Sequence, residues 1–97
     1  MSKQQVLADI QAYIAQNGGA CSSWYAGIAS NPGDRLFNGH AVMENSDYWI
    51  FRTCDSNADA RGVEDALFRL GAQGGPGGGD NATKAVYAYK ICTHTVE

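Results

Sequence analysis

The segment WYAGIASNPGDRLFNGH, residues 24–40, decides the fold, because it joins a strand pattern directly to a helix start. Its first six residues are aromatic or apolar and are bounded by serines, which favours a short strand. Residues 31–34, Asn-Pro-Gly-Asp, then supply an N-cap, a first-turn proline and an acidic residue. We predict a strand at about 24–29 and a helix at about 32–43. Gly27, inside the strand, predicts close approach by another group.

The rest of the chain continues this alternation of helix and strand. Ser2 and Gln5 form a capping box ahead of apolar residues at helical spacing, and Ser56 with Asp59 repeats the signal later. The order is α-β-α-β-α-β, which predicts a small α/β or α+β domain with a three-stranded sheet flanked by three helices; the pattern does not fix the strand order. The further predicted elements are a helix at about 3–17, a strand at about 48–54, a helix at about 57–71 and a strand at about 85–92.

Length and composition indicate one globular domain. The chain has 97 residues, of which 44% are hydrophobic and 18% charged, so we expect large side chains such as Trp24, Trp49 and Phe51 to supply much of the stability. The glycine-rich run has no Lys-Ser or Lys-Thr after it, which argues against a nucleoside-triphosphate loop. The expected parts of the domain are an N-terminal helix (1–19), a core (24–71), a glycine-rich loop (72–83) and a C-terminal strand (84–93).

The charge balance restricts the class of partner. Seven Lys and Arg against ten Asp and Glu give a net charge of −3, so contact with nucleic acid would have to be local. The sequence shows no signal-peptide pattern and no apolar run of membrane-spanning length, so we expect a cytoplasmic protein without membrane contact. Cys21, Cys54 and Cys92 fit neither a disulfide framework nor a zinc motif, and we expect three reduced thiols.

Glu64 is the most informative candidate site residue. A helical projection places it within the apolar arc of its helix, between Leu67 and Phe68, whereas Arg61 and Asp65 project away. A carboxylate that faces a core is costly unless it is paired, protonated or bound to a metal. Two interpretations are open: a boundary glutamate that reaches water or an arginine, and a metal ligand or acid–base group.

Other candidates carry weaker signals. Arg35 follows a helix start, where it is either an exposed side chain or part of a phosphate clamp. His40 lies near the end of that helix, as a general base or as a partner of the helix dipole. Tyr25, Tyr87 and Tyr89 lie in predicted strands, where buried aromatics are the ordinary expectation.

One stretch of the chain resembles the second half of the signature of the GIY-YIG endonucleases. It consists of the strand Tyr25-Ala26-Gly27, then Arg35, eight residues after Gly27, and then His40. The helix around Glu64 is similar to the family helix that carries an inward glutamate. The resemblance covers about residues 24–70, and His40 lies one residue further from Arg35 than the corresponding family residue does.

The chain has no Gly-Ile-Tyr strand upstream of this region, because residues 3–17 read as a helix. Residues 86–89, Val-Tyr-Ala-Tyr, could take the place of this missing strand if they pair with residues 24–28. The chain would then be a circular permutation of the family core, which surface termini and a long glycine-rich connection tolerate.

The resemblance implies a DNA endonuclease of bacterial or phage type that uses one Mg²⁺ or Mn²⁺ ion. Glu64 would hold the metal, Arg35 would neutralise phosphate charge, and Tyr25 with Tyr87 or Tyr89 would position or deprotonate the attacking water. The alternative is a non-catalytic module on the same scaffold that binds a protein partner, which the acidic charge favours because Lys and Arg contacts to phosphate are scarce.

Overall fold

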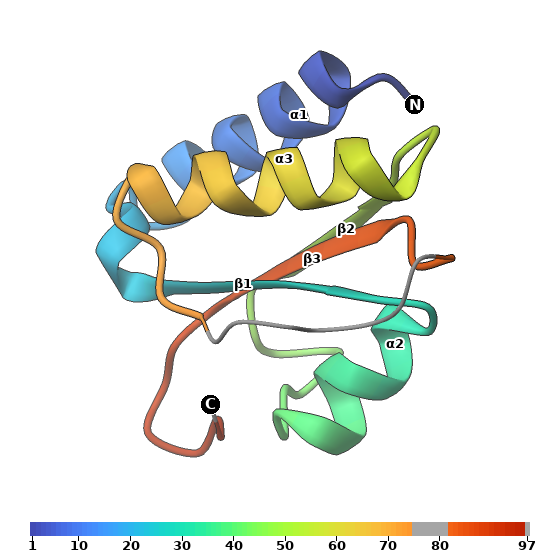
Figure 1. Ribbon diagram of the computed structural model, residues 1–97. Coiled ribbons are helices and arrows are strands. Elements are labelled where there is room, and N and C mark those ends of the chain that lie inside the picture. Colours follow the sequence, from blue (N-terminus) through green and yellow to red (C-terminus); the bar gives the residue numbers. More distant parts are fainter. Residues whose placement is uncertain (75–81, 97) are drawn as a thin grey trace.

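The structure is a computed structural model that describes residues 1–74 and 82–96 (Figure 1). It is an α+β domain in which two long helices lie on one side of a sheet and one short helix lies on the other. The helices are α1 (Lys3–Gln16), α2 (Pro32–Asp34) and α3 (Asn57–Arg69), with a 3₁₀ turn η1 (Cys21–Ser23) and a π-helical turn η2 (Arg35–Gly39); the strands are β1 (Trp24–Ala29), β2 (Trp49–Thr53) and β3 (Ala85–Lys90).

The last strand in the sequence lies in the middle of the sheet. The strand order is β1-β3-β2, and β3 is antiparallel to both neighbours. Tyr87 of β3 therefore lies opposite Gly27 on one side and opposite Phe51 on the other. The expected pairing of residues 86–89 with residues 24–28 is confirmed.

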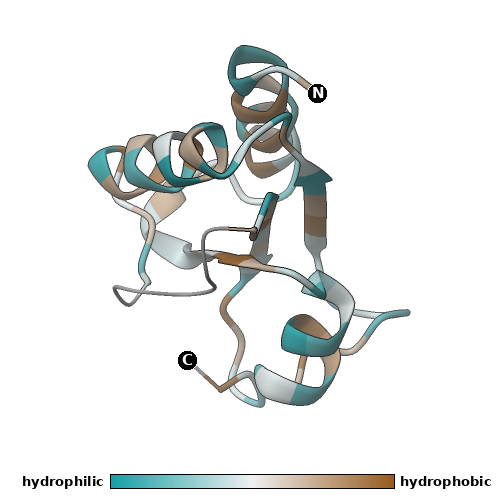
Figure 2. Cartoon of the chain, turned by 45° about the vertical axis from the view of Figure 1, so that its right-hand side comes forward, coloured by the Kyte–Doolittle hydropathy of each residue, from teal (hydrophilic) through white to brown (hydrophobic). Residues whose placement is uncertain are grey.

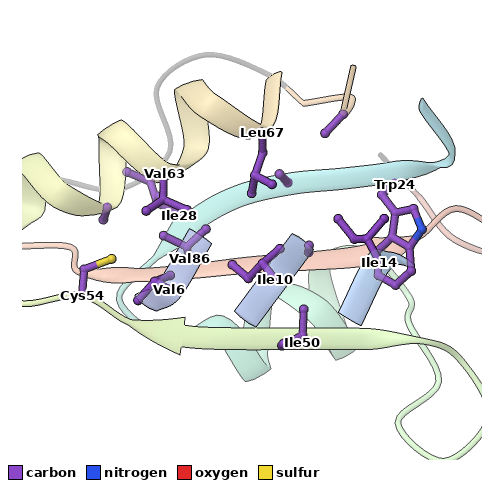
Figure 3. Close-up of a cluster of buried hydrophobic side chains, with 14 residues drawn as sticks. Val6, Ile10, Ile14, Trp24, Ile28, Ile50, Cys54, Val63, Leu67 and Val86 are labelled. Atoms are coloured by element: carbon purple, nitrogen blue, oxygen red, sulfur yellow. The ribbon is translucent and has the colours of Figure 1, made fainter. Parts of the chain in front are cut away.

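One face of the sheet packs against α1 and α3. Buried side chains from both helices meet alternate residues of the three strands in a single hydrophobic cluster (Figure 3). Both helices alternate hydrophobic and hydrophilic residues along the chain (Figure 2), as amphipathic helices do. The largest contributors to this cluster are Val6, Ile10, Ile14, Trp24, Ile28, Ile50, Val63, Leu67 and Val86.

The opposite face carries the remaining strand residues, because successive side chains of a strand point to opposite sides. Tyr87 and Tyr89 are fully buried there under the segment that contains α2 and η2, and Tyr25 and Trp49 pack beside them. This second cluster is rich in aromatic hydroxyl groups, so it holds the polar chemistry of the domain. The C-terminal residues after β3 run along the same side.

The local start and stop signals are confirmed. Ser2 and Gln5 form the capping box of α1, Asn31 caps α2 and Ser56 caps α3.

The three cysteines are free. Burial raises the pKa of the Cys54 thiol, with a smaller contribution from the charge of Asp59. Among the described residues, no helix combines the length and the apolar character needed to cross a bilayer.

The predicted helix at 32–43 is wrong in its extent. Three residues of α2 pass into the wider turn η2, which ends at Gly39 with a hydrogen bond of 2.8 Å from the His40 N–H to the Arg35 carbonyl. Ala41 then adopts a left-handed conformation with φ of 58°, which stops the helix. This early stop turns His40 inward instead of leaving it on a helix surface.

Two predicted core residues are only partly buried. Trp24 is buried as expected, but Trp49 is half-buried and Phe51 is 37% exposed, because β2 is an edge strand whose outer side is not covered by the described residues. Leu70, placed in the inward arc of its helix by the projection, is 49% exposed because α3 ends at Arg69.

The contact of Gly27 with Tyr87 gives a direct test of this packing. A Cβ atom at Gly27 would lie 2.6 Å from the Tyr87 hydroxyl and 2.7 Å from its Cζ atom, and the buried ring cannot swing away into solvent. We expect Gly27→Ala to lower the free energy of unfolding by about 1–3 kcal/mol, as overpacking does.

The control is Gly39→Ala, because no atom lies within 4 Å of the added Cβ atom. It should change stability by less than about 1 kcal/mol, in the stabilising direction. Urea denaturation of both variants measures the difference, and equal effects would contradict the close contact.

Candidate functional site

The hydroxyl group of Tyr87 is the centre of the candidate site. The His40 Nε2 atom lies 2.8 Å from it, and the exposed Arg35 side chain lies near enough to lower its pKa. Arg35 leaves η2 at the surface, whereas His40 follows the end of η2 and is 4% exposed. The widened turn thus brings a cation and an imidazole to one phenol.

The protonation of His40 follows from its second contact. Its Nδ1 atom lies 2.6 Å from the carbonyl oxygen of Val96, which can only accept a hydrogen bond. Nδ1 therefore carries a proton, and in the neutral ring Nε2 is an acceptor. It follows that the Tyr87 hydroxyl donates to His40 Nε2, while the nearby Arg35 charge acts on its oxygen.

Burial sets the proton affinity of Tyr87. Burial raises the pKa of its hydroxyl, the nearby Arg35 side chain opposes this increase, and Tyr25 and Glu64 add to it, so that the net direction is upward. The phenol is therefore protonated near neutral pH and is able to donate. A second positive charge near the site would favour its ionised form.

Tyr25 and Tyr89 complete the wall around His40. The Tyr25 ring lies 4.7 Å from the His40 ring and stacks at 5.3 Å on the Tyr89 ring, measured between centroids. The Tyr89 hydroxyl lies 3.2 Å from both His40 Nδ1 and the Val96 carbonyl oxygen. Tyr89 thus supports the imidazole, whereas Tyr87 is the tyrosine that contacts Arg35.

Glu64 comes from α3, which packs on the other face of the sheet. It is 8% exposed, as the projection predicts, and burial raises the pKa of its carboxyl group while Arg61 lowers it less. Within residues 1–74 and 82–96 it forms no ion pair and no hydrogen bond through its side chain. Its charge acts on Tyr87, so the two groups are electrostatic neighbours.

The donor chemistry suits a hard divalent cation. A buried carboxylate without a partner in the described part of the chain is the group that a cation would stabilise, and Mg²⁺ accepts one or two carboxylates together with water and phosphate oxygens. The described residues contain no group of three or more His, Cys, Asp or Glu side chains, so an all-protein cage is not built from them. Glu64 is the residue that would hold the ion.

A shallow pocket lies beside Arg35. Its volume is about 240 Å³, and it is lined by residues 28–31, Asp34 and Arg35. Among the candidate residues only Arg35 lines this pocket, whereas Tyr25, His40, Glu64, Tyr87 and Tyr89 do not. The structure therefore brings Arg35, His40, Tyr25, Tyr87 and Tyr89 into one cluster, and links Glu64 to that cluster through its charge on Tyr87.

Sequence reasoning missed the C-terminal residues. The Val96 N–H donates to the His40 carbonyl at 2.8 Å while the Val96 carbonyl accepts from His40 Nδ1, and His94 forms an ion pair with Asp47 at 2.5 Å. Val96 acts through its backbone, so no side-chain signal could have revealed it. The pairing of His94 with Asp47 joins two loops that are far apart in the sequence.

Comparisons with models of protein families, with curated proteins and with solved structures found no match to this chain. The GIY-YIG resemblance therefore rests on the residues themselves.

The ion pair between Asp47 and His94 predicts an acid-sensitive support for the site. Burial raises the pKa of the Asp47 carboxyl, but hydrogen bonds from the Met43 N–H and from His94 lower it more, so the net pKa lies below its usual 3.8. A lowered pKa stabilises the fold above that value, and the contribution is lost as the pH falls through the folded-state pKa.

We expect Asp47→Asn to lower the free energy of unfolding by about 1 kcal/mol near pH 5.5, and this deficit to shrink below about pH 3.8. Asp65→Asn is the control, because Asp65 is 60% exposed in its pair with Arg69 and should contribute little at either pH. Denaturation curves across this range measure both, and a deficit that does not change with pH would contradict the ion pair.

Proposed function

We propose that this protein is a metal-dependent endonuclease, similar to the GIY-YIG enzymes, that hydrolyses phosphodiester bonds in DNA. The observation that carries the proposal is the Tyr87 hydroxyl, which donates to His40 Nε2 and lies near the Arg35 guanidinium, whose charge lowers its pKa. This is a phenol with a base on one side and an anion-binding cation on the other.

The hydrogen bonds define a route for one proton. As a water molecule attacks phosphorus, it gives a proton to the Tyr87 oxygen, while Tyr87 passes its own proton to His40 Nε2. His40 becomes an imidazolium whose Nδ1–H still donates to the Val96 carbonyl, and this hydrogen bond stabilises the positive charge. The bond between phosphorus and the leaving oxygen then breaks, and solvent protonates that oxygen.

Arg35 stabilises the charge that grows on the phosphate. Its guanidinium is exposed and carries several N–H donors, so it can bind a phosphate oxygen. The pocket beside it has space for such a group. A fixed positive charge at this position lowers the barrier of an in-line displacement.

Glu64 supports the same chemistry from α3. Glu64 would hold Mg²⁺ or Mn²⁺, and a bound ion would supply Lewis-acid polarisation of a phosphate oxygen. The buried carboxyl group, without a partner among the described residues, fits that role.

The sheet also supports a permuted relationship to the family. β3 pairs with β1 along its whole length, so Tyr87 stands beside the Tyr-x-Gly strand although it lies at the other end of the chain. We propose that β3 takes the place of the absent Gly-Ile-Tyr strand and that Tyr87, not Tyr89, is the tyrosine that acts on water.

The direct test is cleavage of plasmid and branched DNA with Mg²⁺ or Mn²⁺. Glu64→Gln should abolish cleavage, and Arg35→Ala should lower the rate by about 10²- to 10³-fold, as loss of a charge-stabilising donor does. Arg69→Ala is the matched control, since Arg69 is exposed on the other side of α3 in a surface ion pair, and its rate should stay near that of the wild type. Cleavage that survives in Glu64→Gln would contradict the metal role.

A second pair of variants separates the two buried tyrosines. Tyr87→Phe removes the hydroxyl between Arg35 and His40 and should lower the rate by about 10²- to 10⁴-fold, the usual range for loss of a proton-transfer group. Tyr89→Phe keeps that hydroxyl and should cost less than about tenfold. Equal losses would overturn the assignment to Tyr87.

The alternative remains a module that binds a protein partner without catalysis. Absence of cleavage by the folded wild type, across both metals and both substrates, would favour that function over the enzyme.

A further inference from the structure

The chain after β3 runs back against His40 as a short strap, residues 92–96. The side chains of the strap bury little surface, since Thr93, His94 and Val96 are exposed. Burial of apolar groups therefore contributes little to its position, and hydrogen bonds hold it in place. A segment that is held mainly by exposed hydrogen bonds opens at a low cost in free energy.

Two sets of hydrogen bonds attach the strap to the rest of the domain. At its end, the Val96 N–H donates to the His40 carbonyl at 2.8 Å, and the Val96 carbonyl accepts from His40 Nδ1 at 2.6 Å. Two residues earlier, His94 Nε2 donates to the carboxylate of Asp47. A carboxylate accepts from an imidazole N–H whether or not the ring is charged, so this second attachment does not require a protonated His94.

Asp47 is the fixed half of the second attachment. Only 6% of its side chain is exposed, against 43% for that of His94. Its carboxylate also accepts from the Met43 N–H, and its own N–H donates to the Met43 carbonyl, both at 2.8 Å. Asp47 is therefore held in the loop before β2, and His94 is the partner that moves with the strap.

The Tyr89 hydroxyl makes the position of the strap matter to His40. It lies 3.2 Å from both His40 Nδ1 and the Val96 carbonyl oxygen. When the strap is closed, the carbonyl accepts from both groups, so Nδ1 carries the ring proton. When the carbonyl is withdrawn, Nδ1 remains within reach of the hydroxyl as an acceptor. Tyr89 then donates to Nδ1, and the ring proton belongs on Nε2.

The two tautomers act on Tyr87 in opposite ways. With the strap closed, the bare Nε2 accepts from the Tyr87 hydroxyl. With the strap open, Nε2–H donates to the Tyr87 oxygen and has no lone pair left for a proton. The ring stays neutral in both states, because one proton leaves Nδ1 for solvent and another is taken up at Nε2.

We propose that the strap is a tautomer switch for His40, and that Asp47 is the positioning residue that keeps it closed by binding His94. The closed strap gives an imidazole that can act as a base, and the open strap gives one that cannot. The consequence for catalysis rests on the proposed function, whereas the exchange of tautomers does not.

Hydrogen exchange of the Val96 amide measures how often the strap opens. His94→Ala should speed this exchange by about 5- to 50-fold, because it removes a hydrogen bond to a charged group and leaves the Asp47 loop intact. Thr93→Ala is the matched control, since Thr93 is an exposed neighbour in the strap whose side chain forms no hydrogen bond with the described residues. Exchange that stays at the wild-type rate in His94→Ala would overturn the role of Asp47.

Val96→Pro tests the switch itself, because it prevents closure. The proline Cδ atom replaces the amide hydrogen and cannot fit within the 2.8 Å contact to the His40 carbonyl. In ¹⁵N NMR spectra of the neutral His40 ring, Nε2 should be bare in the wild type and protonated in Val96→Pro. Val96→Ala keeps both backbone groups and should match the wild type. A bare Nε2 in folded Val96→Pro would overturn the switch.

Cleavage assays separate the switch from the proposed function. Val96→Pro should lower kcat by about 10²- to 10⁴-fold, as loss of a general base does, and leave KM nearly unchanged because Arg35 still binds phosphate. A changed tautomer with unchanged cleavage would overturn His40 as the base and leave the switch. If the wild type cleaves no DNA, the nuclease is overturned, and the exchange and NMR results still decide the switch.

Discussion

The contact between the Tyr87 ring and Gly27 is the constraint on which the candidate site depends. A side chain at position 27 would occupy the place of the phenol hydroxyl, so only glycine lets the ring lie against β1. The ring is buried by this contact, and its hydroxyl is fixed at the point that Arg35 and His40 reach from the other side. Gly27 weakens its strand, but it is required for the hydrogen bond that the Tyr87 hydroxyl makes.

The position of Tyr87 also depends on the central place of β3 in the sheet. A strand between two others is paired on both edges, so its side chains are held more firmly than those of an edge strand. Tyr87 therefore gains a fixed position, while Phe51 on the edge strand β2 keeps an open side. The sheet thus holds a rigid hydroxyl against β1 and leaves a partly exposed ring on β2.

Much of this fold was readable from local signals. Capping residues, the strand at 24–29 and the inward direction of Glu64 all depend on interactions within a few residues, and all were predicted. The strand order, the exposure of Phe51 and the early end of the helix after Asp34 depend on partners far away in the chain. Local periodicity carries no information about those partners, which is why these features needed the structure.

His40 shows how far such long-range dependence extends. Its ring is oriented by the backbone of Val96, 56 residues away, and its other nitrogen is occupied by Tyr87, 47 residues away. Sequence alone left open whether this histidine was a base or a partner of the helix dipole. The Val96 carbonyl decides the tautomer, because an oxygen without a proton forces Nδ1 to donate and leaves Nε2 to accept. The direction of the hydrogen bond from Tyr87 is therefore a property of the folded C-terminal segment, and a nuclease built on this site would depend on that segment for its base.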